Sequence, residues 1–231
     1  MRTFLFAIGV SLAFVPPAGA ATRNFGVTSF TKVRVEGPFK ITLATGVAPF
    51  AKASGSSIAL DRVDVDVQGD TLVVRSSASS WGGYPGTDPG PVAISIGTHD
   101  LTNAWLSGAG TLAIDRVRGL SFALSVQGSG RAEIGSVDAD QMNVSVVGSG
   151  SARLAGRAKK LTALARGLAE LDAGGLAATD ATIGAEGATT IDANVSDAAT
   201  VDASGPATIR LTGRPSCTLK VAGSTSVSGC R

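Results

Sequence analysis

The fold is decided by three segments that recur every 20 residues: Leu106-Ser107-Gly108-Ala109-Gly110, Val126-Gln127-Gly128-Ser129-Gly130 and Val146-Val147-Gly148-Ser149-Gly150. An alignment on a glycine followed four residues later by a large aliphatic residue extends this repeat to the end of the chain. The seven matches are Gly110/Ile114, Gly130/Ile134, Gly150/Leu154, Gly167/Leu171, Gly187/Ile191, Gly205/Ile209 and Gly223/Val227. A period of 17 to 20 residues is typical of a solenoid, in which each repeat forms one coil.

The residues around the aligned glycine have the period of a β-strand. Apolar or small residues stand two and four residues before and after the glycine, and the third residue after it is mostly polar. Alternate residues of a strand face opposite sides, so the apolar set is predicted to point inward and the polar column outward. We predict an all-β, single-stranded β-helix with coils of about 18–20 residues over about 104–231, and a positive φ at the aligned glycine.

The N-terminal part, residues 25–105, is strand-like but less regular. Apolar and polar residues alternate around Gly37-Pro38 and from Val63 to Val74, and residues 76–91 are a loop insertion rich in Ser, Gly and Pro. This part is expected to cap the solenoid, because an open end exposes unpaired strand edges. The Ala-rich stretch 173–188 would suit a helix by propensity, but its glycines and the repeat favour strand.

The first 20 residues have the pattern of an export signal: Arg2, an apolar run from Phe4 to Val15, and Ala18-Gly19-Ala20. The apolar run is too short for a membrane helix, and no later stretch is long enough. Residues 21–231 are therefore expected to form one soluble domain that is periplasmic, on the cell surface or secreted. Without residues 1–20, 19 basic residues stand against 18 acidic ones, which argues against nucleic-acid binding.

The hydrophobic residues are mainly Ala and Val, with few aromatics, so the interior is expected to be narrow. The chain has two cysteines, Cys217 and Cys230, and in an oxidising compartment such a pair most simply forms a disulfide. This bond would close the last coil and stabilise it by about 3 kcal/mol.

The order of these features resembles the head GIN domain, a bacterial family named putative auto-transporter adhesin. The likeness rests on residues 30–41, on 63–74 with Gly69-Asp70-Thr71-Leu72, and on the recurring Gly-x-Gly corners. It covers nearly all of residues 21–231. The resemblance implies an exported, β-helix-like domain for which the family name suggests adhesion, and it supplies no active site to carry over.

We expect neither catalysis nor a cofactor, because the sequence contains no catalytic constellation. The only histidine, His99, lies in the turn 97–100 without a paired nucleophile. The Gly-x-Gly pairs open no helix and follow from the repeat rather than from phosphate binding. Four acids in 61–70 could offer oxygen ligands to Ca²⁺, but they lack a calcium-binding repeat, and no metal is expected. These acids are Asp61, Asp64, Asp66 and Asp70.

Two groups of residues could contact a partner. Trp81 and Tyr84 lie in the loop insertion and could stack on a sugar or a protein, or have no binding role. The other group is a basic run without an intervening acid, which is either a solvated turn or a site for acidic glycans or lipid headgroups. Its members are Arg153, Arg157, Lys159, Lys160 and Arg166.

Three functions are compatible with the sequence. We favour a non-enzymatic envelope or secreted protein that uses one face of the solenoid for adhesion, with a cell-surface glycan or an envelope protein as partner. The second is a polysaccharide-active enzyme, which needs acids grouped along one groove, and here the candidate acids belong to different coils. These acids are Glu133, Glu170, Asp172 and Asp192. The third is a glycan-binding module that uses Trp81 and Tyr84. The oligomeric state is left open.

Overall fold

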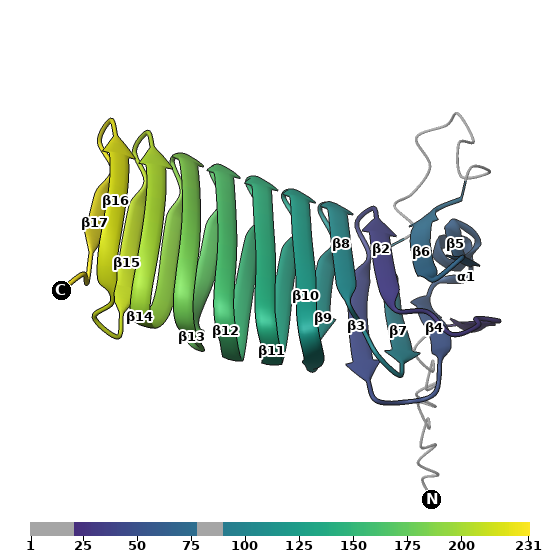
Figure 1. The fold of residues 1–231 in the computed structure, drawn as a ribbon. Coiled ribbons are helices and arrows are strands. Elements are labelled where there is room, and N and C mark those ends of the chain that lie inside the picture. Colours follow the sequence, from purple (N-terminus) through teal and green to yellow (C-terminus); the bar gives the residue numbers. More distant parts are fainter. Residues whose placement is uncertain (1–20, 78–89) are drawn as a thin grey trace, which may run out of the picture.

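The computed structural model describes residues 21–77 and 90–231, which form a β-solenoid with one short helix (Figure 1). Across these residues the coil makes about six stacked turns. The regular part begins with β8 (Asn103–Gly108), β9 (Thr111–Ile114) and β10 (Val117–Gly128). It continues through β11 (Arg131–Gly148), β12 (Ser151–Gly167), β13 (Glu170–Gly187) and β14 (Thr190–Ser204), and ends with β15 (Thr208–Thr212), β16 (Ser216–Ala222) and β17 (Ser226–Ser228). The predicted all-β solenoid is confirmed, and the Ala-rich stretch is strand.

Each full coil has three straight segments separated by corners. In β11 every second residue is buried, but two or more consecutive residues are not buried at 135–136, at 140–141 and at 147–149. Such breaks mark corners, because both residues of the break point outward. We name the faces by the residues of β11 that they contain: face A has 141–148, face B has 131–134 and face C has 137–139.

The coils stack in parallel register. On face A, Val146 of β11 lies beside Val126 of β10 and Ala165 of β12. Residues about one repeat apart in the chain are therefore neighbours, one strand spacing of about 4.8 Å apart. The interior is narrow, as expected, and many of its buried side chains are Ala. One inward column tapers along the stack through Phe122, Met142, Leu161, Ala181, Ala199 and Cys217.

The predicted register of the repeat is wrong by two residues in its first three coils. The glycines with positive φ that stack on one another are Gly108, Gly128, Gly148, Gly167, Gly187, Gly205 and Gly223. The expected positive φ is thus confirmed at the last four aligned glycines but not at Gly110, Gly130 and Gly150. In these three coils the corner is formed by the glycine two residues earlier, which the alignment had placed inward. The alignment required a large aliphatic residue four positions after the glycine, and the coils of Gly128 and Gly148 have Ala132 and Ala152 there.

The N-terminal part is irregular, as predicted, and it covers one end of the stack. The coil formed by β2 (Lys32–Glu36) and β3 (Lys40–Thr45) lies between that of β6 (Thr71–Ser76) and β7 (Ala93–Thr98) and that of β8 and β9. Spatial order therefore differs from chain order. Outside this last coil, β5 (Val63–Gln68) pairs antiparallel with β6, and β4 (Phe50–Gly55) pairs antiparallel with β7 and β1 (Ala21–Phe25).

A helix that the sequence analysis did not predict completes this end. Helix α1 (Ser57–Asp61) begins after Ser56, whose side chain accepts a hydrogen bond from the backbone N–H of Ala59, a standard N-cap. The helix buries Ala59 and Leu60. The predicted loop 76–91 is only partly described: Ser76 belongs to β6, and residues 78–89 lie outside the described part of the chain. The predicted signal 1–20 also lies outside it.

The predicted disulfide Cys217–Cys230 is confirmed and closes the last coil, with 5.7 Å between the two Cα atoms. It joins β16 to the residues after β17. It does not cover the inward side chains of that coil, because Leu219 is 44% exposed and Val221 51% exposed. Both were predicted to be inward. They lie on the inward side of the coil, but no further coil among the described residues packs against them.

Glycine can be required for two reasons, a positive φ or a close approach of the neighbouring coil, and three alanine variants separate them. Gly119 (φ +140°) has open space where a Cβ would lie, whereas a Cβ at Gly150 would lie 2.8 Å from the carbonyl oxygen of Gly130. Gly148 combines φ +109° with an approach of 2.6 Å to the carbonyl oxygen of Gly128. Left-handed strain costs about 1–2 kcal/mol and overpacking about 1–3 kcal/mol. Urea unfolding should therefore rank Gly148→Ala as the most destabilising of the three alanine variants. Equal losses for Gly148→Ala and Gly119→Ala would show that coil packing does not require the glycine.

Removal of the disulfide should loosen only the last coil. The double variant Cys217→Ser/Cys230→Ser is expected to lose about 3 kcal/mol of local stability. Because each coil of a solenoid contacts only its neighbours, amide hydrogen exchange should accelerate in β16 and β17 and remain unchanged in β11 to β13. Unchanged exchange in β16 and β17 would contradict the role of the disulfide as a staple.

Candidate binding site on face A

The outer surface of face A carries a column of side chains, one from each successive strand. In order along the stack these are Arg34 of β2, Trp105 of β8, Ser125 of β10, Ser145 of β11 and Leu164 of β12. They point outward because their neighbours in each strand, such as Ala104 and Leu106 beside Trp105, are buried in the core. From Trp105 to Leu164 the column crosses three strand spacings, about 14 Å.

Trp105 is the aromatic side chain of this column, and it is held in place on the sheet. Its ring is partly exposed. The Cζ atom of Arg34, on the neighbouring strand, lies over the ring at 5.7 Å from its centroid, within the range of a cation–π interaction. A nitrogen of Arg34 also lies 4.0 Å from a carboxylate oxygen of Glu36 on the same strand. The indole is therefore anchored from the β2 side.

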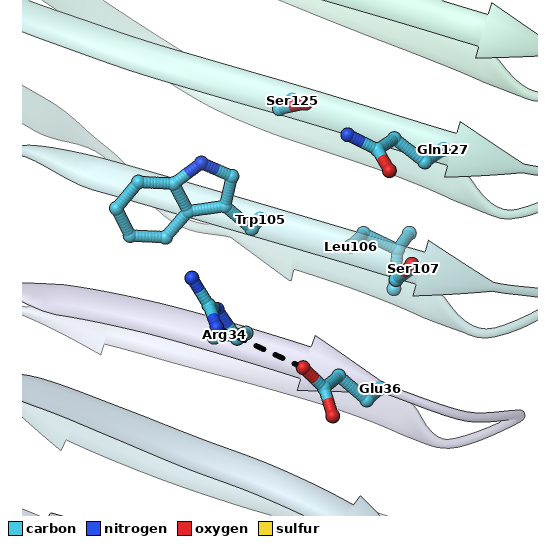
Figure 2. A pocket seen from close by; sticks show the side chains of 7 residues that line it. All are labelled: Arg34, Glu36, Trp105, Leu106, Ser107, Ser125 and Gln127. Carbon is cyan, nitrogen blue, oxygen red and sulfur yellow. Dashed lines mark ion pairs between the residues drawn. The ribbon is translucent and has the colours of Figure 1, made fainter. Parts of the chain in front are cut away.

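A polar hollow of about 240 Å³ lies on one side of Trp105, and its lining is shown in Figure 2. Arg34 and Glu36 of β2 form its lower edge in that view, and Ser125 and Gln127 of β10 form its upper edge. Ser107 completes the polar lining. The hollow thus offers a guanidinium and an amide as donors, a carboxylate and an amide oxygen as acceptors, and hydroxyls that act as either.

A second hollow, of about 270 Å³, lies on the other side of Trp105 and is mostly apolar. Trp105 and Leu164 bound it along the stack, and the small side chains of Ala123, Ser125 and Ser145 form its floor. Asn143 and Thr162 add polar groups from the next column. Because two serines stand between two large side chains, the surface is hollowed where the column would otherwise be continuous.

The two hollows and the ring form a shallow, elongated surface rather than an enclosed pocket. Each hollow is smaller than the roughly 300–1,000 Å³ that is usual for a site that encloses a small molecule. An elongated partner could stack on the exposed indole, make hydrogen bonds in the polar hollow and pack in the apolar one. The site offers recognition by shape and by polar groups, and it brings no nucleophile and base together.

Trp105 was missed by the sequence analysis, although a signal was present. It immediately precedes Leu106, which the repeat places inward, so the alternation of the strand places Trp105 outward. A tryptophan at an outward position among Ser, Asn and Thr is unusual for a solvated strand. The predicted aromatic contacts, Trp81 and Tyr84, lie outside the described residues.

The basic run is largely neutralised by the coils on either side. Arg153 pairs with Asp172 at 3.4 Å, Arg157 with Asp138 at 2.8 Å, Lys159 with Asp140 at 2.8 Å and Arg166 with Glu186 at 2.9 Å. Lys160 has no such ion pair among the residues that the structure describes. The run has no acid in the sequence, but stacking places acids from residues about 20 positions away beside it.

Stacking also gathers acids that the sequence analysis treated as separate. Glu133 lies on β11 and Glu170 and Asp172 lie on β13, but all three line one hollow of about 130 Å³ on face B, together with Arg131 and Arg153. Asp192 lies farther along the stack and pairs with Arg210 at 2.6 Å. The expectation that these acids do not share a groove is therefore wrong for three of the four.

The remaining candidates do not line the two hollows beside Trp105. Asp61 pairs with Arg23, Asp64 with Arg75 and Asp70 with Lys32, at 2.8, 2.8 and 3.0 Å. The hydrogen bond from Lys32 lowers the pKa of Asp70. In residues 21–77 and 90–231, His, Cys, Asp and Glu side chains nowhere gather in threes around a possible metal site. His99 is exposed and lines a separate hollow of about 320 Å³ with Arg116 and Arg118.

Within the part of the chain that the structure describes, no helix is long and apolar enough to cross a membrane.

The fold and this surface define the chain as a β-solenoid with an open, hollowed face. The family model described as "Putative auto-transporter adhesin, head GIN domain" matches residues 29–215. The chain belongs to this family. No protein among the curated sequences matches it.

Several solved structures share the fold. A putative adhesin from Bacteroides fragilis NCTC 9343 has a TM-score of 0.80 at 19% identity, over 92% of this chain and 96% of that one. A structure titled as a putative lipid binding protein, from Parabacteroides distasonis ATCC 8503, has a TM-score of 0.72 at 18% identity, over 91% and 96% of the two chains. A putative adhesin from Parabacteroides merdae ATCC 43184 has a TM-score of 0.65 at 16% identity, over 91% and 95%.

The pairing of Asp138 with Arg157 should be visible in its titration. The guanidinium donates to both carboxylate oxygens, at 2.8 and 3.0 Å, and these hydrogen bonds lower the pKa of Asp138. In Arg157→Gln the pKa of Asp138 should rise toward about 3.9, as measured by NMR titration of its carboxyl carbon. Because the folded-state pKa is the lowered one, the stability from this pair is present above about pH 4 and is lost as the pH falls through the folded-state pKa. An unchanged titration of Asp138 in the variant would contradict the pairing.

Proposed function

We propose that this protein is a non-enzymatic, exported binding protein that contacts its partner through face A, in an adhesin-type role at the cell surface or in the periplasm. The observation that carries the proposal is Trp105, anchored by Arg34 and partly exposed between two hollows. Aromatic residues are enriched where protein surfaces bind partners, because they bury a large area at a low cost in side-chain entropy.

The family name and the titles of structural neighbours support a binding role. The matching family and two of the neighbours named above are described as adhesins, and one neighbour is titled a lipid binding protein. The sequence features of residues 1–20 support export. The proposal moves the contact from Trp81 and Tyr84 to Trp105, because Trp105 lies on strand β8 between a polar and an apolar hollow.

The alternative of a polysaccharide-active enzyme depends on the acids of face B. Glu133, Glu170 and Asp172 share one hollow, but Asp172 is bound by Arg153 and also accepts a hydrogen bond from the backbone N–H of Gly174. In a glycosidase, one carboxyl group donates a proton on one side of the glycosidic bond, and a second carboxylate acts as base or nucleophile on the other side. Both groups must be free of ion pairs to do so. Asp172 is not free in this way, and we favour binding over catalysis because the exposed Trp105 lies between two hollows.

Replacement of Trp105 should weaken binding to cell envelopes without unfolding the chain. In a sedimentation assay with residues 21–231 and envelopes of a bacterium that produces the protein, Trp105→Ala should bind at least tenfold more weakly, as expected for an aromatic hot spot of about 2 kcal/mol. The matched control is Leu120→Ala, which removes a side chain that is 79% exposed at a corner outside both hollows and should change binding less than twofold.

Two results would contradict the proposal. Equal binding by the wild type and Trp105→Ala, with circular dichroism showing both folded, would remove face A as the contact. Release of reducing sugar or of unsaturated products from any polysaccharide in a turnover screen would contradict a non-enzymatic role. If that turnover were lost in Glu133→Gln and kept in Trp105→Ala, the functional site would lie on face B.

A further inference from the structure

We infer that the ligand of face A is a neutral glycan chain that runs along the solenoid axis, with one sugar ring stacked on Trp105 and the adjoining rings in the two hollows. This inference rests on the proposed function, because it assigns a ligand to the same face. It adds the chemical class of the ligand, its direction and its minimum length.

The stacking step follows from the position of the indole. A pyranose ring has an apolar face of C–H groups, which packs on an aromatic ring while the hydroxyls around its edge remain free to form hydrogen bonds. Figure 2 shows the ring of Trp105 broadside, with Arg34 on its β2 side and Ser125 on its β10 side. The Cζ atom of Arg34 lies 5.7 Å from the centroid of the ring and holds it from the β2 side. On the β10 side the small Ser125 leaves space for a ligand.

The charges around Trp105 favour a ligand without charge. Arg34, the cation of the polar hollow, lies 4.0 Å from the carboxylate of Glu36, so this pair has no net charge. Gln127, Ser107 and Ser125 are neutral donors and acceptors. A uronic acid, sulfate or phosphate would require a cation that is not already paired. Two members of the basic run, Lys160 and Arg166, each lie two residues from a lining residue of the apolar hollow. Arg166 is paired with Glu186 at 2.9 Å, and Lys160 lies beside Asp180 of the next strand.

The arrangement of the hollows sets the direction and the length. The polar hollow spans β2, β8 and β10, and the apolar hollow spans β8 through β12. From Arg34 to Leu164 is four strand spacings, about 19 Å, and the line between them crosses the strands. A chain that fills both hollows and covers Trp105 therefore needs at least three sugar rings. Because both hollows are open, the chain can continue beyond them, which suits internal residues of a polymer.

The test is isothermal titration calorimetry of residues 21–231 against a defined panel. The panel contains neutral hexose oligomers of two to six units from glucan, mannan and N-acetylglucosamine series, polygalacturonate and heparin as acidic polymers, and phosphatidylcholine vesicles as a lipid probe. We expect binding to one neutral series, with an affinity that rises steeply from two to three units and changes less than twofold between 50 and 500 mM salt, because no ion pair is made with the ligand.

Variants test the assigned contacts. Trp105→Ala should weaken glycan binding at least tenfold, whereas Trp105→Phe, which keeps an aromatic face, should stay within about fivefold of the wild type. Ser145→Leu should also weaken binding at least tenfold, because it fills the floor of the apolar hollow while leaving Trp105 in place. Leu120→Ala is the matched control and should bind as the wild type. Thermal unfolding of every variant shows that the chain is folded.

The outcomes separate this inference from the proposed function. Binding to the acidic polymers alone, to vesicles alone, or to no member of the panel overturns the neutral glycan. If envelope binding still depends on Trp105 in that case, the proposed function stands and its partner is of another class. Glycan binding that is equal in the wild type, Trp105→Ala and Ser145→Leu overturns the assigned site as well.

Discussion

The structure depends on the close approach of one coil to the next at the Gly-x-Gly corner. At Gly148 a Cβ atom would lie 2.6 Å from the carbonyl oxygen of Gly128, and at Gly128 it would lie 2.9 Å from that of Gly108. Each corner thus rests directly on the corner before it, and strand spacing rather than side-chain size sets the distance between coils. This contact keeps the faces in register, and the registered faces then bring small residues such as Ala165 and Ala185 together in the buried core.

Registered stacking also decides the electrostatics of the surface. Arg157 and Asp138 are 19 residues apart in the chain, yet their side chains meet at 2.8 Å. The same step joins Arg210 to Asp192 and Arg166 to Glu186. A basic or acidic run in the sequence therefore does not predict the charge of a solenoid face, because each side chain lies beside the residues one repeat before and after it. Exposed pairs of this kind contribute little stability, and their main effect here is to offset the positive charges of the basic run.

The periodic part of the fold could be predicted from the sequence because strand alternation tolerates an error of two residues. The register that aligned Gly150 with Gly167 was off by two, yet Leu154 and Leu171 both point inward, since a shift of two keeps every side chain on its side of the strand. The interleaved N-terminal coil could not be predicted in this way. Its strands β2 and β3 pair with partners on both sides, and alternation alone contains no information on the order in which coils stack.

The candidate site was hidden for a related reason. Trp105, Ser125, Ser145 and Leu164 are spread over 60 residues, and only registered stacking makes them neighbours in one column. Within such a column, a hollow arises wherever small residues stand between large ones. Its prediction therefore requires a comparison of side-chain sizes at equivalent positions of successive coils, not of neighbours in the sequence. Trp105 is followed across the stack by two serines and then a leucine, and its charged neighbours Arg34 and Glu36 are paired. A surface of this kind suits the proposed recognition by stacking and hydrogen bonds, because its geometry supplies an aromatic ring and two hollows while the charges of Arg34 and Glu36 offset each other.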